Sequence, residues 1–306
     1  MSEVPASAGQ ARLGPLTDVE RSELRGTCSD WYAEHGRDLP WRREGTTPWG
    51  VLVSEVMSQQ TPMARVVAPW TQWMERWPTP DDLAEEEPGA AVAAWGRLGY
   101  PRRALRLHAC AVAIARQYGG VVPSRYEDLI GLPGIGDYTA AAVVSFAFGG
   151  RAAVLDTNVR RVLARVERGV ANCASATTRA DRELAARWLP DGDADAARWA
   201  VASMELGALI CTARTPSCQL CPVAAHCRWV VAGKPLDGAP VRRGQPWKGT
   251  DRQCRGVILD LVRNSAAGVE IEVALAAWPS RHQAEKCLGS LLDDGLVHQK
   301  GSTLRL

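Results

Sequence analysis

Four cysteines crowded into one short segment limit what this chain can fold into more than any other feature. The segment has six, two and five residues between successive cysteines, in the order Cys211, Cys218, Cys221 and Cys227. Thiols this close in sequence can all bind one metal ion or one metal cluster. The total of nine cysteines is odd, which argues against a framework of disulfides. The other five lack ligand spacing and are expected to be ordinary thiols: Cys28, Cys110, Cys173, Cys254 and Cys287.

The spacing also bears on which group the four cysteines hold. Four thiolates suit tetrahedral zinc, but zinc sites usually combine two C-x-x-C pairs. Here only Cys218 and Cys221 form such a pair, and the other gaps are wide. A wide and uneven loop fits the larger [4Fe-4S] cluster better, since four cysteine thiolates hold such a cluster. The sequence therefore favours a [4Fe-4S] cluster, with structural zinc as the alternative.

Charge and hydropathy narrow the class of protein. The 306 residues are 46% hydrophobic and carry a net charge of +2, because 36 basic residues nearly cancel 34 acidic ones. Net charge alone therefore does not indicate a nucleic-acid binder. No run of 18 apolar residues occurs, and the first fifteen residues lack the apolar block of a signal peptide. We expect a cytoplasmic protein that does not enter membranes.

Apolar residues at spacings of three and four run through most of the chain, which is the pattern of helices packed on a core. Pro, Gly, Asp and Thr bound most of these stretches, as they do at helix starts and stops. No alternating run of strand length occurs before the last sixty residues, so we expect an all-α body. The predicted helices lie near residues 17–35, 49–67, 69–76, 88–96, 101–118, 124–130, 137–148, 157–168, 177–189 and 195–209.

The C-terminal residues predict a separate small module. Residues 232–249 are rich in proline and glycine, which is typical of a linker. Beyond them, a short hairpin with Gly301 near its turn follows three predicted helices, near 253–263, 270–277 and 281–293. Three helices and a hairpin suggest a winged-helix-like module at 250–306. On sequence grounds, this module serves either DNA contact or packing and dimerisation.

Two glycines predict a contact with a nucleic-acid backbone. Gly134 and Gly136 form a tight turn between a helix that ends near Ile130 and one that begins at Asp137, which is a helix-hairpin-helix arrangement. Glycine lets backbone N–H groups approach a phosphate oxygen closely, and the helix N-terminus adds its positive dipole end. Such a contact anchors DNA without reading its sequence. A simple turn between helices is the alternative.

Three motifs follow one another in order: GLPGIG, VLDTNVRRVLAR and the cysteine loop. In this combination the chain resembles the endonuclease III superfamily of DNA glycosylases. DLPWR at 38–42, TPWGVLVSEVMSQQT at 47–61 and RLGYPRRALRLH at 97–108 are similar to its MutY branch, the adenine DNA glycosylases. The resemblance covers residues 30–230 in outline. It implies an all-α, two-lobed fold with a helix-hairpin-helix and a [4Fe-4S] loop.

The same resemblance divides the chain into parts. Many members of the branch end in a domain similar to nucleotide-sanitising MutT hydrolases, and the C-terminal module is too short to be one. The resemblance therefore implies no choice between 8-oxoguanine and guanine opposite adenine. The expected parts are a disordered tail at 1–15, a cluster lobe at 16–45 and 157–231, a six-helix lobe at 46–156, a linker at 232–249 and the module at 250–306.

Tyr138 distinguishes two reaction types. Bifunctional relatives carry a lysine at this point of the hairpin motif, and its amine attacks the sugar to form a Schiff base that leads to strand cleavage. This chain has Tyr138 there, and no lysine precedes Lys234. The resemblance therefore implies hydrolysis of the base without strong lyase activity.

Two carboxyl groups are candidates for that hydrolysis, since an acid must protonate the leaving group and a carboxylate must face the oxocarbenium ion. Glu55 lies three residues after Leu52, at the edge of an apolar helix stripe, and partial burial there would raise its pKa. Otherwise it is an ordinary flanking residue. Asp156 precedes TNVRRVLARV and is also a candidate helix N-cap. By resemblance, Glu55 protonates adenine and Asp156 stabilises the sugar cation, with Asn158 and Tyr138 orienting Asp156 and the attacking water.

A base inside a duplex must be turned out before it can react, and side chains then fill the gap. By resemblance, Gln60 and Tyr100 are the candidate wedges, although Pro101 replaces the second tyrosine usual in that element. Arginines near these loops are candidates for phosphate contact, or else form a solvated basic face. These are Arg102, Arg103 and Arg106, together with Arg228 just after the last cysteine.

The expected partner is double-stranded DNA with A:8-oxoguanine or A:G mispairs, bound by a nucleoid-associated monomer. Two other functions stay open on the sequence. One is a mismatch-specific thymine or uracil glycosylase, against which Glu55 argues because pyrimidine excision needs no acid there. The other is a DNA-binding redox sensor without enzymatic activity, against which Glu55, Asp156 and Tyr138 argue together.

Overall fold

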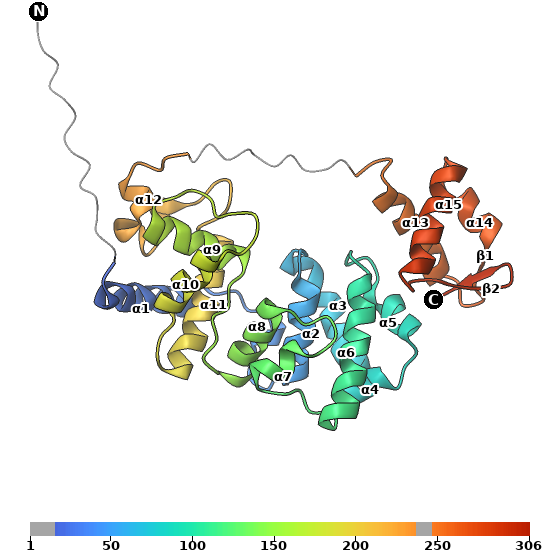
Figure 1. Cartoon of the computed structure of the whole chain (residues 1–306), viewed down its shortest axis with the longest axis horizontal. Helices are drawn as coiled ribbons and strands as arrows, with labels where there is room; N and C mark the ends of the chain where they lie inside the picture. Colours follow the sequence, from blue (N-terminus) through green and yellow to red (C-terminus); the bar gives the residue numbers. More distant parts are fainter. Residues whose placement is uncertain (1–15, 237–246) are drawn as a thin grey trace, which may run out of the picture. The chain divides into compact units, whose positions relative to one another are not determined.

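The computed structural model describes residues 16–236 and 247–306. The tail expected at 1–15 and the middle of the expected linker, residues 237–246, lie outside these described residues. Within them, helices predominate and all strands follow residue 268 (Figure 1). Two compact units form: residues 16–38 with 144–236, and residues 39–143 with 247–306. No helix in the described ranges is long and apolar enough to cross a membrane.

The first unit is assembled from the N-terminal helix and the later part of the chain. Helix α11 packs against both α1 and α9, and α12 packs on the turn that follows α9. That turn, Ala164–Arg168, is a π-helical continuation of α9, and short 3-10 turns occupy Cys218–Leu220 and Ala224–His226. The helices of this unit are α1 (Asp18–His35), α9 (Thr157–Leu163), α10 (Arg179–Trp188), α11 (Asp193–Leu209) and α12 (Arg228–Val231).

The second unit contains the hairpin motif. Helix α6 packs against α4 and α5, and α2 packs against α3. A 3-10 turn at Pro40–Arg42 precedes α2. The helices are α2 (Pro48–Ser58), α3 (Met63–Arg76), α4 (Pro80–Ala84), α5 (Pro88–Trp95), α6 (Arg102–Tyr118), α7 (Tyr126–Ile130) and α8 (Asp137–Phe148), of which α8 begins in the second unit and ends in the first.

The C-terminal module contains the three helices and the hairpin that the sequence predicts, plus a two-residue edge strand. Its sheet is antiparallel with strand order β1-β3-β2, and Leu304 of the central strand is fully buried. Gly301 has a φ of 62° at the hairpin turn, a conformation that glycine adopts without strain. The elements are α13 (Asp251–Arg263), β1 (Val269–Glu270), α14 (Ile271–Ala276), α15 (Arg281–Asp293), β2 (His298–Lys300) and β3 (Thr303–Arg305).

One predicted helix is wrong in its boundaries. The sequence predicts a continuous helix over 49–67, whereas α2 ends at Ser58 and α3 begins at Met63. Gln60 has a φ of 53°, in the left-handed region that no right-handed helix contains, and Pro62 disfavours helical geometry in the residue before it. Conversely, α3 continues through Pro69, where a boundary was predicted, at the loss of one backbone hydrogen bond.

Tryptophans fill the cores of both units. In the second unit, Trp73 packs edge-to-face against Trp77 and Trp95, with ring centroids 4.8 and 5.6 Å away. In the first, Trp188 stacks on Trp199 at 5.3 Å. Aromatic pairs in these geometries add to the stabilisation from burying their area. The helices that carry the candidate site residues therefore rest on rigid cores.

Asp181 joins α9, α10 and the π-helical turn through buried ion pairs. Its Oδ2 accepts hydrogen bonds from Arg160 Nη2 at 2.9 Å and from the Thr178 backbone N–H at 3.0 Å, and its Oδ1 accepts one from Arg168 Nη1 at 2.8 Å. Burial by itself raises the pKa of the Asp181 carboxyl. The hydrogen bonds from Thr178, Arg160 and Arg168 outweigh burial and bring this pKa down to about 2.

This depressed pKa predicts how stability depends on pH. Because the folded pKa of Asp181 lies below its ordinary value of 3.8, its stabilisation is present above that value and is lost as the pH falls toward 2. We expect Asp181→Asn to lower the free energy of unfolding at neutral pH by about 2 kcal/mol and to have less effect near pH 3. Urea unfolding at both pH values measures this. Glu183→Gln, an exposed carboxylate of the same helix, is the control and should show no such difference.

Candidate functional site

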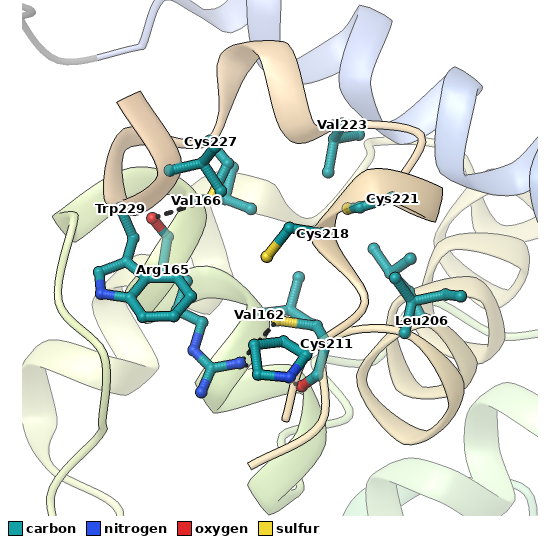
Figure 2. A pocket seen from close by; sticks show the side chains of 13 residues that line it. Val162, Arg165, Val166, Leu206, Cys211, Cys218, Cys221, Val223, Cys227 and Trp229 are labelled. Atoms are coloured by element: carbon teal, nitrogen blue, oxygen red, sulfur yellow. Dashed lines mark hydrogen bonds between the residues drawn. The ribbon is translucent and has the colours of Figure 1, made fainter. Parts of the chain in front are cut away.

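The four clustered cysteines line one cavity in the first unit, as Figure 2 shows. Its empty space is about 330 Å³, part of it continuous with solvent. Apolar side chains complete the wall, among them Val162, Leu206 and Val223. Within the described residues, no three His, Cys, Asp or Glu side chains are grouped so that they could hold a single metal ion. The four thiols predicted to act together are thus brought together.

Arg165 provides the charge that a set of thiolates requires. Its Nη1 donates to the Sγ of Cys211 at 3.3 Å, and its guanidinium stacks on the Trp229 ring at 4.6 Å (Figure 2). The thiol of Cys227 also donates to the backbone carbonyl of Arg165 at 3.4 Å. Burial and the neighbouring cysteines raise the pKa of Cys221 to about 11. Four thiolates therefore need positive charge beside them, which iron would supply from within the cavity and Arg165 supplies from its edge.

Asp156 and Asn158 form a second candidate group at the start of α9. Asp156 is the N-cap of that helix, and its Oδ1 accepts a hydrogen bond from the Val159 backbone N–H at 2.7 Å. Its Oδ2 accepts one from Asn158 Nδ2 at 2.7 Å. Burial raises the pKa of the Asp156 carboxyl, and these hydrogen bonds only partly oppose that effect. A carboxylate held in these surroundings is weakly solvated, and stabilises a nearby cation strongly.

Two residues that sequence reasoning missed hold this group in place. Arg161 Nη2 donates to Asn158 Oδ1 and to the Gly207 carbonyl, both at 2.6 Å, and its Nε donates to the Cys211 carbonyl at 2.6 Å. At Gly207, an added Cβ would lie 2.7 Å from the Asn158 Cβ, so glycine permits this close approach of α11 to α9. Arg161 and Arg165 lie one helical turn apart, on the same helix face, and this spacing was the sequence signal that could have pointed to Arg161.

Glu55 and Tyr138 meet in the second unit. Glu55 lies in the second turn of α2. Thr47 caps this helix and Pro48 occupies its first position, so these two residues determine where the helix begins. Glu55 is 8% exposed, so it is buried more deeply than the edge position that the sequence predicts. Tyr138 Oη, from the first turn of α8, donates to Glu55 Oε2 at 2.8 Å. The residue that stands where bifunctional relatives have lysine therefore holds the second candidate carboxyl.

The hairpin turn between α7 and α8 requires only one of its two predicted glycines. Gly134 has a φ of 79°, and a Cβ there would lie 2.7 Å from the Cβ of Arg106 on α6. Gly136 has no neighbour within 4 Å of an added Cβ and no positive φ. Open space at Gly136 fits the close approach of a phosphate oxygen, whereas Gly134 is needed for the fold itself.

Both candidate wedges stand on strained, exposed loops. Gln60 and Tyr100 have φ values of 53° and 48°, which side chains other than glycine rarely adopt. Gln60 is exposed and Tyr100 is 49% exposed, in the loops that precede α3 and α6 respectively. These positions leave both side chains accessible to a ligand.

Two of the arginines predicted as phosphate contacts are placed differently. The prediction for Arg103 is wrong, since Arg103 is 7% exposed and its guanidinium bonds to backbone carbonyls, whereas Arg102 and Arg106 are exposed. Arg228 is half-buried, with its Nη1 donating to the Glu167 carbonyl at 2.8 Å. Its phosphate contact stays a prediction.

Comparisons with known families agree with this geometry. Residues 53–188 match the HhH-GPD superfamily of base excision DNA repair proteins. Residues 211–227, from the first to the last clustered cysteine, match the iron-sulfur binding domain of endonuclease III. Together with the four-thiol cavity, this match identifies the group as a [4Fe-4S] cluster and sets the zinc alternative aside.

Curated relatives resemble the chain over most of its length. The adenine DNA glycosylase of Mycolicibacterium smegmatis is 50% identical over 272 residues, which covers 88% of this chain and 90% of that protein. The human adenine DNA glycosylase is 40% identical over 235 residues, which covers 74% of this chain and 43% of the human protein.

Solved structures share the fold. A thermostable thymine-DNA glycosylase matches with a TM-score of 0.61 and 26% identity, over 69% of this chain and 96% of that one. Endonuclease III in a non-covalent DNA complex matches with a TM-score of 0.60 and 23% identity, over 71% of this chain and 98% of that one. This second likeness concerns the fold alone.

The cavity predicts which cysteines retain iron. Cys218→Ser should lower the iron and sulfide bound per chain and the visible absorbance of the purified protein, because one of four thiolate ligands is lost. Cys173→Ser is the matched control: this cysteine belongs to the same unit but does not line the cavity, so its iron content should equal that of the unaltered chain. Equal iron loss in both variants would contradict the assignment.

Proposed function

The chain belongs to the adenine DNA glycosylase family, and we propose that it hydrolyses the N-glycosidic bond of adenine mispaired with 8-oxoguanine or guanine in double-stranded DNA. The observation that carries the proposal is the buried Glu55 carboxyl held by Tyr138, where a lyase would have lysine. We further infer that the chain acts as a monomer associated with the nucleoid.

Glu55 acts on the base in this proposal. Adenine leaves readily only when a ring nitrogen is protonated, which requires an acid within hydrogen-bonding reach. Glu55 is 8% exposed, so its carboxyl would meet the extruded adenine largely away from bulk water. The hydrogen bond from Tyr138 Oη fixes the orientation of the carboxyl. Glu55 thus gives its proton to adenine as the bond to the sugar breaks.

Asp156 acts on the sugar. Loss of adenine leaves positive charge on the sugar ring, and a carboxylate already in position stabilises that charge without reorganisation. The Val159 N–H and the Asn158 amide hold both oxygens of Asp156 at 2.7 Å. Burial makes the charged form unfavourable until a cation develops beside it, so the attraction is greatest in the transition state. Water, oriented by Asn158 and Tyr138, then adds to the sugar, and the proton that it loses returns to the Glu55 carboxylate, which restores the acid.

The absence of a lysine nucleophile determines the product. No lysine precedes Lys234 in the sequence, and Tyr138 cannot form a Schiff base. The reaction therefore ends at an abasic site in an intact strand. The cysteines 211, 218, 221 and 227 hold the [4Fe-4S] cluster, whose contribution when bound is to fix the fold of this loop.

Base release from defined mispairs tests the proposal. Duplexes with A opposite 8-oxoguanine, guanine and cytosine, and with T opposite guanine, are incubated with the chain and then treated with alkali to reveal abasic sites. We expect strand breaks at adenine opposite 8-oxoguanine and guanine, and none before alkali. Breaks at thymine alone would support the thymine glycosylase alternative, and no product from any duplex would favour a redox sensor. Equal rates opposite 8-oxoguanine and cytosine would contradict the proposed preference for adenine mispaired with 8-oxoguanine.

Replacing Glu55 separates acid catalysis from binding. Glu55→Gln keeps the size of the side chain and an acceptor for Tyr138 but removes the transferable proton, so we expect single-turnover release of adenine to fall about 100-fold or more. Binding of the mispaired duplex should be little changed. Glu75→Gln, on α3 of the same unit and outside the proposed site, is the control and should keep full activity.

Replacing Asp156 should slow the reaction strongly and yet stabilise the fold. Since burial raises the pKa of Asp156, the stability that this carboxyl contributes is full below its ordinary pKa of 3.8 and is lost as the pH rises through the folded value. At neutral pH the ionised group therefore destabilises the fold. Asp156→Asn can still cap α9, so we expect single-turnover adenine release to fall about 1,000-fold or more, with a higher urea midpoint at pH 7. Asp193→Asn is the exposed control in the same unit, and should change neither property.

A further inference from the structure

Arg103 was expected to touch phosphates, but its surroundings indicate another role. We propose that Arg103 is a positioning residue that joins the two loops carrying Gln60 and Tyr100, so that both side chains enter the duplex in a fixed relation to each other. The inference rests on the proposed function, because it assumes that these two residues fill the gap left by an extruded adenine.

The guanidinium of Arg103 bonds to both loops. Its Nη1 donates to the carbonyls of Val56 and Met57 at 2.6 and 3.0 Å, in the last turn of α2. Its Nη2 donates to Thr61 Oγ1 and to the Gly99 carbonyl, both at 3.0 Å. Thr61 follows Gln60 and Gly99 precedes Tyr100, so one side chain fixes the residue beside each wedge.

Thr61 strengthens the same connection. Its hydroxyl lies 3.2 Å from the Gln59 carbonyl and 3.4 Å from the Leu98 carbonyl, again one acceptor from each loop. The Gly99 carbonyl also accepts a hydrogen bond from Trp95 Nε1 at 2.9 Å, which anchors the second loop to the tryptophan core. The two loops are therefore joined to each other and to the rigid part of the unit.

The charge of Arg103 matches its acceptors. Arg103 forms no ion pair with a carboxylate within the described residues; its partners are carbonyl and hydroxyl oxygens, two of them at the negative C-terminal end of α2. The guanidinium carbon lies 5.1 Å from the Trp95 ring centroid and 5.6 Å from that of Tyr100. Burial lowers the pKa of Arg103 to about 10, so the group is still charged at neutral pH. The charge is used inside the protein and is not offered to a phosphate.

The strained backbone explains why such a connection is needed. Gln60 and Tyr100 both have φ values in the left-handed region, which persists for such residues only where the surroundings determine it. Without the four hydrogen bonds of Arg103, the two loops would relax independently. The wedges would then lose their shared position, although every residue of the proposed chemistry remained.

The experiment measures extrusion apart from bond cleavage. In an Asp156→Asn background, 2-aminopurine placed beside the target adenine reports unstacking by its fluorescence when the protein binds. Arg103→Met removes all four hydrogen bonds at similar side-chain length, and Arg116→Met, exposed near the end of the same helix, is the control. We expect Arg103→Met to abolish most of the fluorescence rise at saturating protein. With Asp156 intact, it should slow single-turnover adenine release about 10- to 100-fold.

A substrate rescue separates positioning from general damage. An adenine opposite an abasic-site analogue is already poorly stacked, so extruding it needs less help from the wedges. The proposal predicts that the Arg103→Met rate on this duplex approaches that of the Arg116→Met control. If Arg103→Met does not fold, Thr61→Val removes one shared contact at equal size and should show a smaller, equally rescued defect.

The outcomes also distinguish this inference from the proposed function. If the unaltered chain releases no adenine from any mispair, the proposed function fails whatever Arg103 does. If the unaltered chain is active, two results would show that the positioning role is wrong. The Arg103 and Thr61 variants could match the control, or they could lose activity on both duplexes alike. In either case the proposed function stands.

Discussion

The burial of the Asp156 carboxyl is the constraint on which the rest of the first unit's site depends. A carboxylate that is to stabilise a sugar cation must be charged, yet burial raises its pKa and disfavours that charge. The start of α9 opposes this effect only in part. The Val159 N–H and the Asn158 amide donate hydrogen bonds to the two oxygens of Asp156, and the pKa of the carboxyl stays raised. Arg161 donates hydrogen bonds both to Asn158, which holds Asp156, and to the carbonyl of Cys211, the first cluster ligand. One side chain therefore connects the cysteine loop to the candidate catalytic carboxyl. Loss of the cluster should therefore disturb the site without any cysteine taking part in the reaction.

Buried arginine side chains hold separate segments of this protein together, a role that sequence patterns assign to apolar side chains. Arg160, Arg165 and Arg103 are all buried, and each bonds to backbone carbonyls that connect separate segments. A planar guanidinium with five donors can serve several carbonyls at once, which the single ammonium of lysine does less well. The scarcity of lysine before residue 234 is consistent with this use. It also leaves residues 1–233 without a lysine amine for lyase chemistry.

Sequence patterns predicted the features that depend on local spacing. The cysteine loop, most helices of the body and the three helices of the C-terminal module follow from separations of a few residues, and the structure confirms them. The short helix α4 was not predicted. Part of what the patterns missed depends on tertiary contacts. The break between α2 and α3 has a local signal in Pro62, but apolar residues continue at helical spacing across it, and the left-handed conformation of Gln60 cannot be read from the sequence. Arg103 itself was expected on the surface, since nothing in its neighbours along the chain reveals four acceptors from other segments.

Glu55 and Asp156 are proposed to act on one chemical step, and a double-variant cycle tests this joint action. Single-turnover release of adenine from an A:8-oxoguanine duplex is measured for the unaltered chain, Glu55→Gln, Asp156→Asn and the double variant. Groups that act together in one transition state give strongly non-additive losses. If both groups act in the same step, the double variant should be about as slow as the slower single variant. A double variant slower by the product of the two separate losses would contradict it.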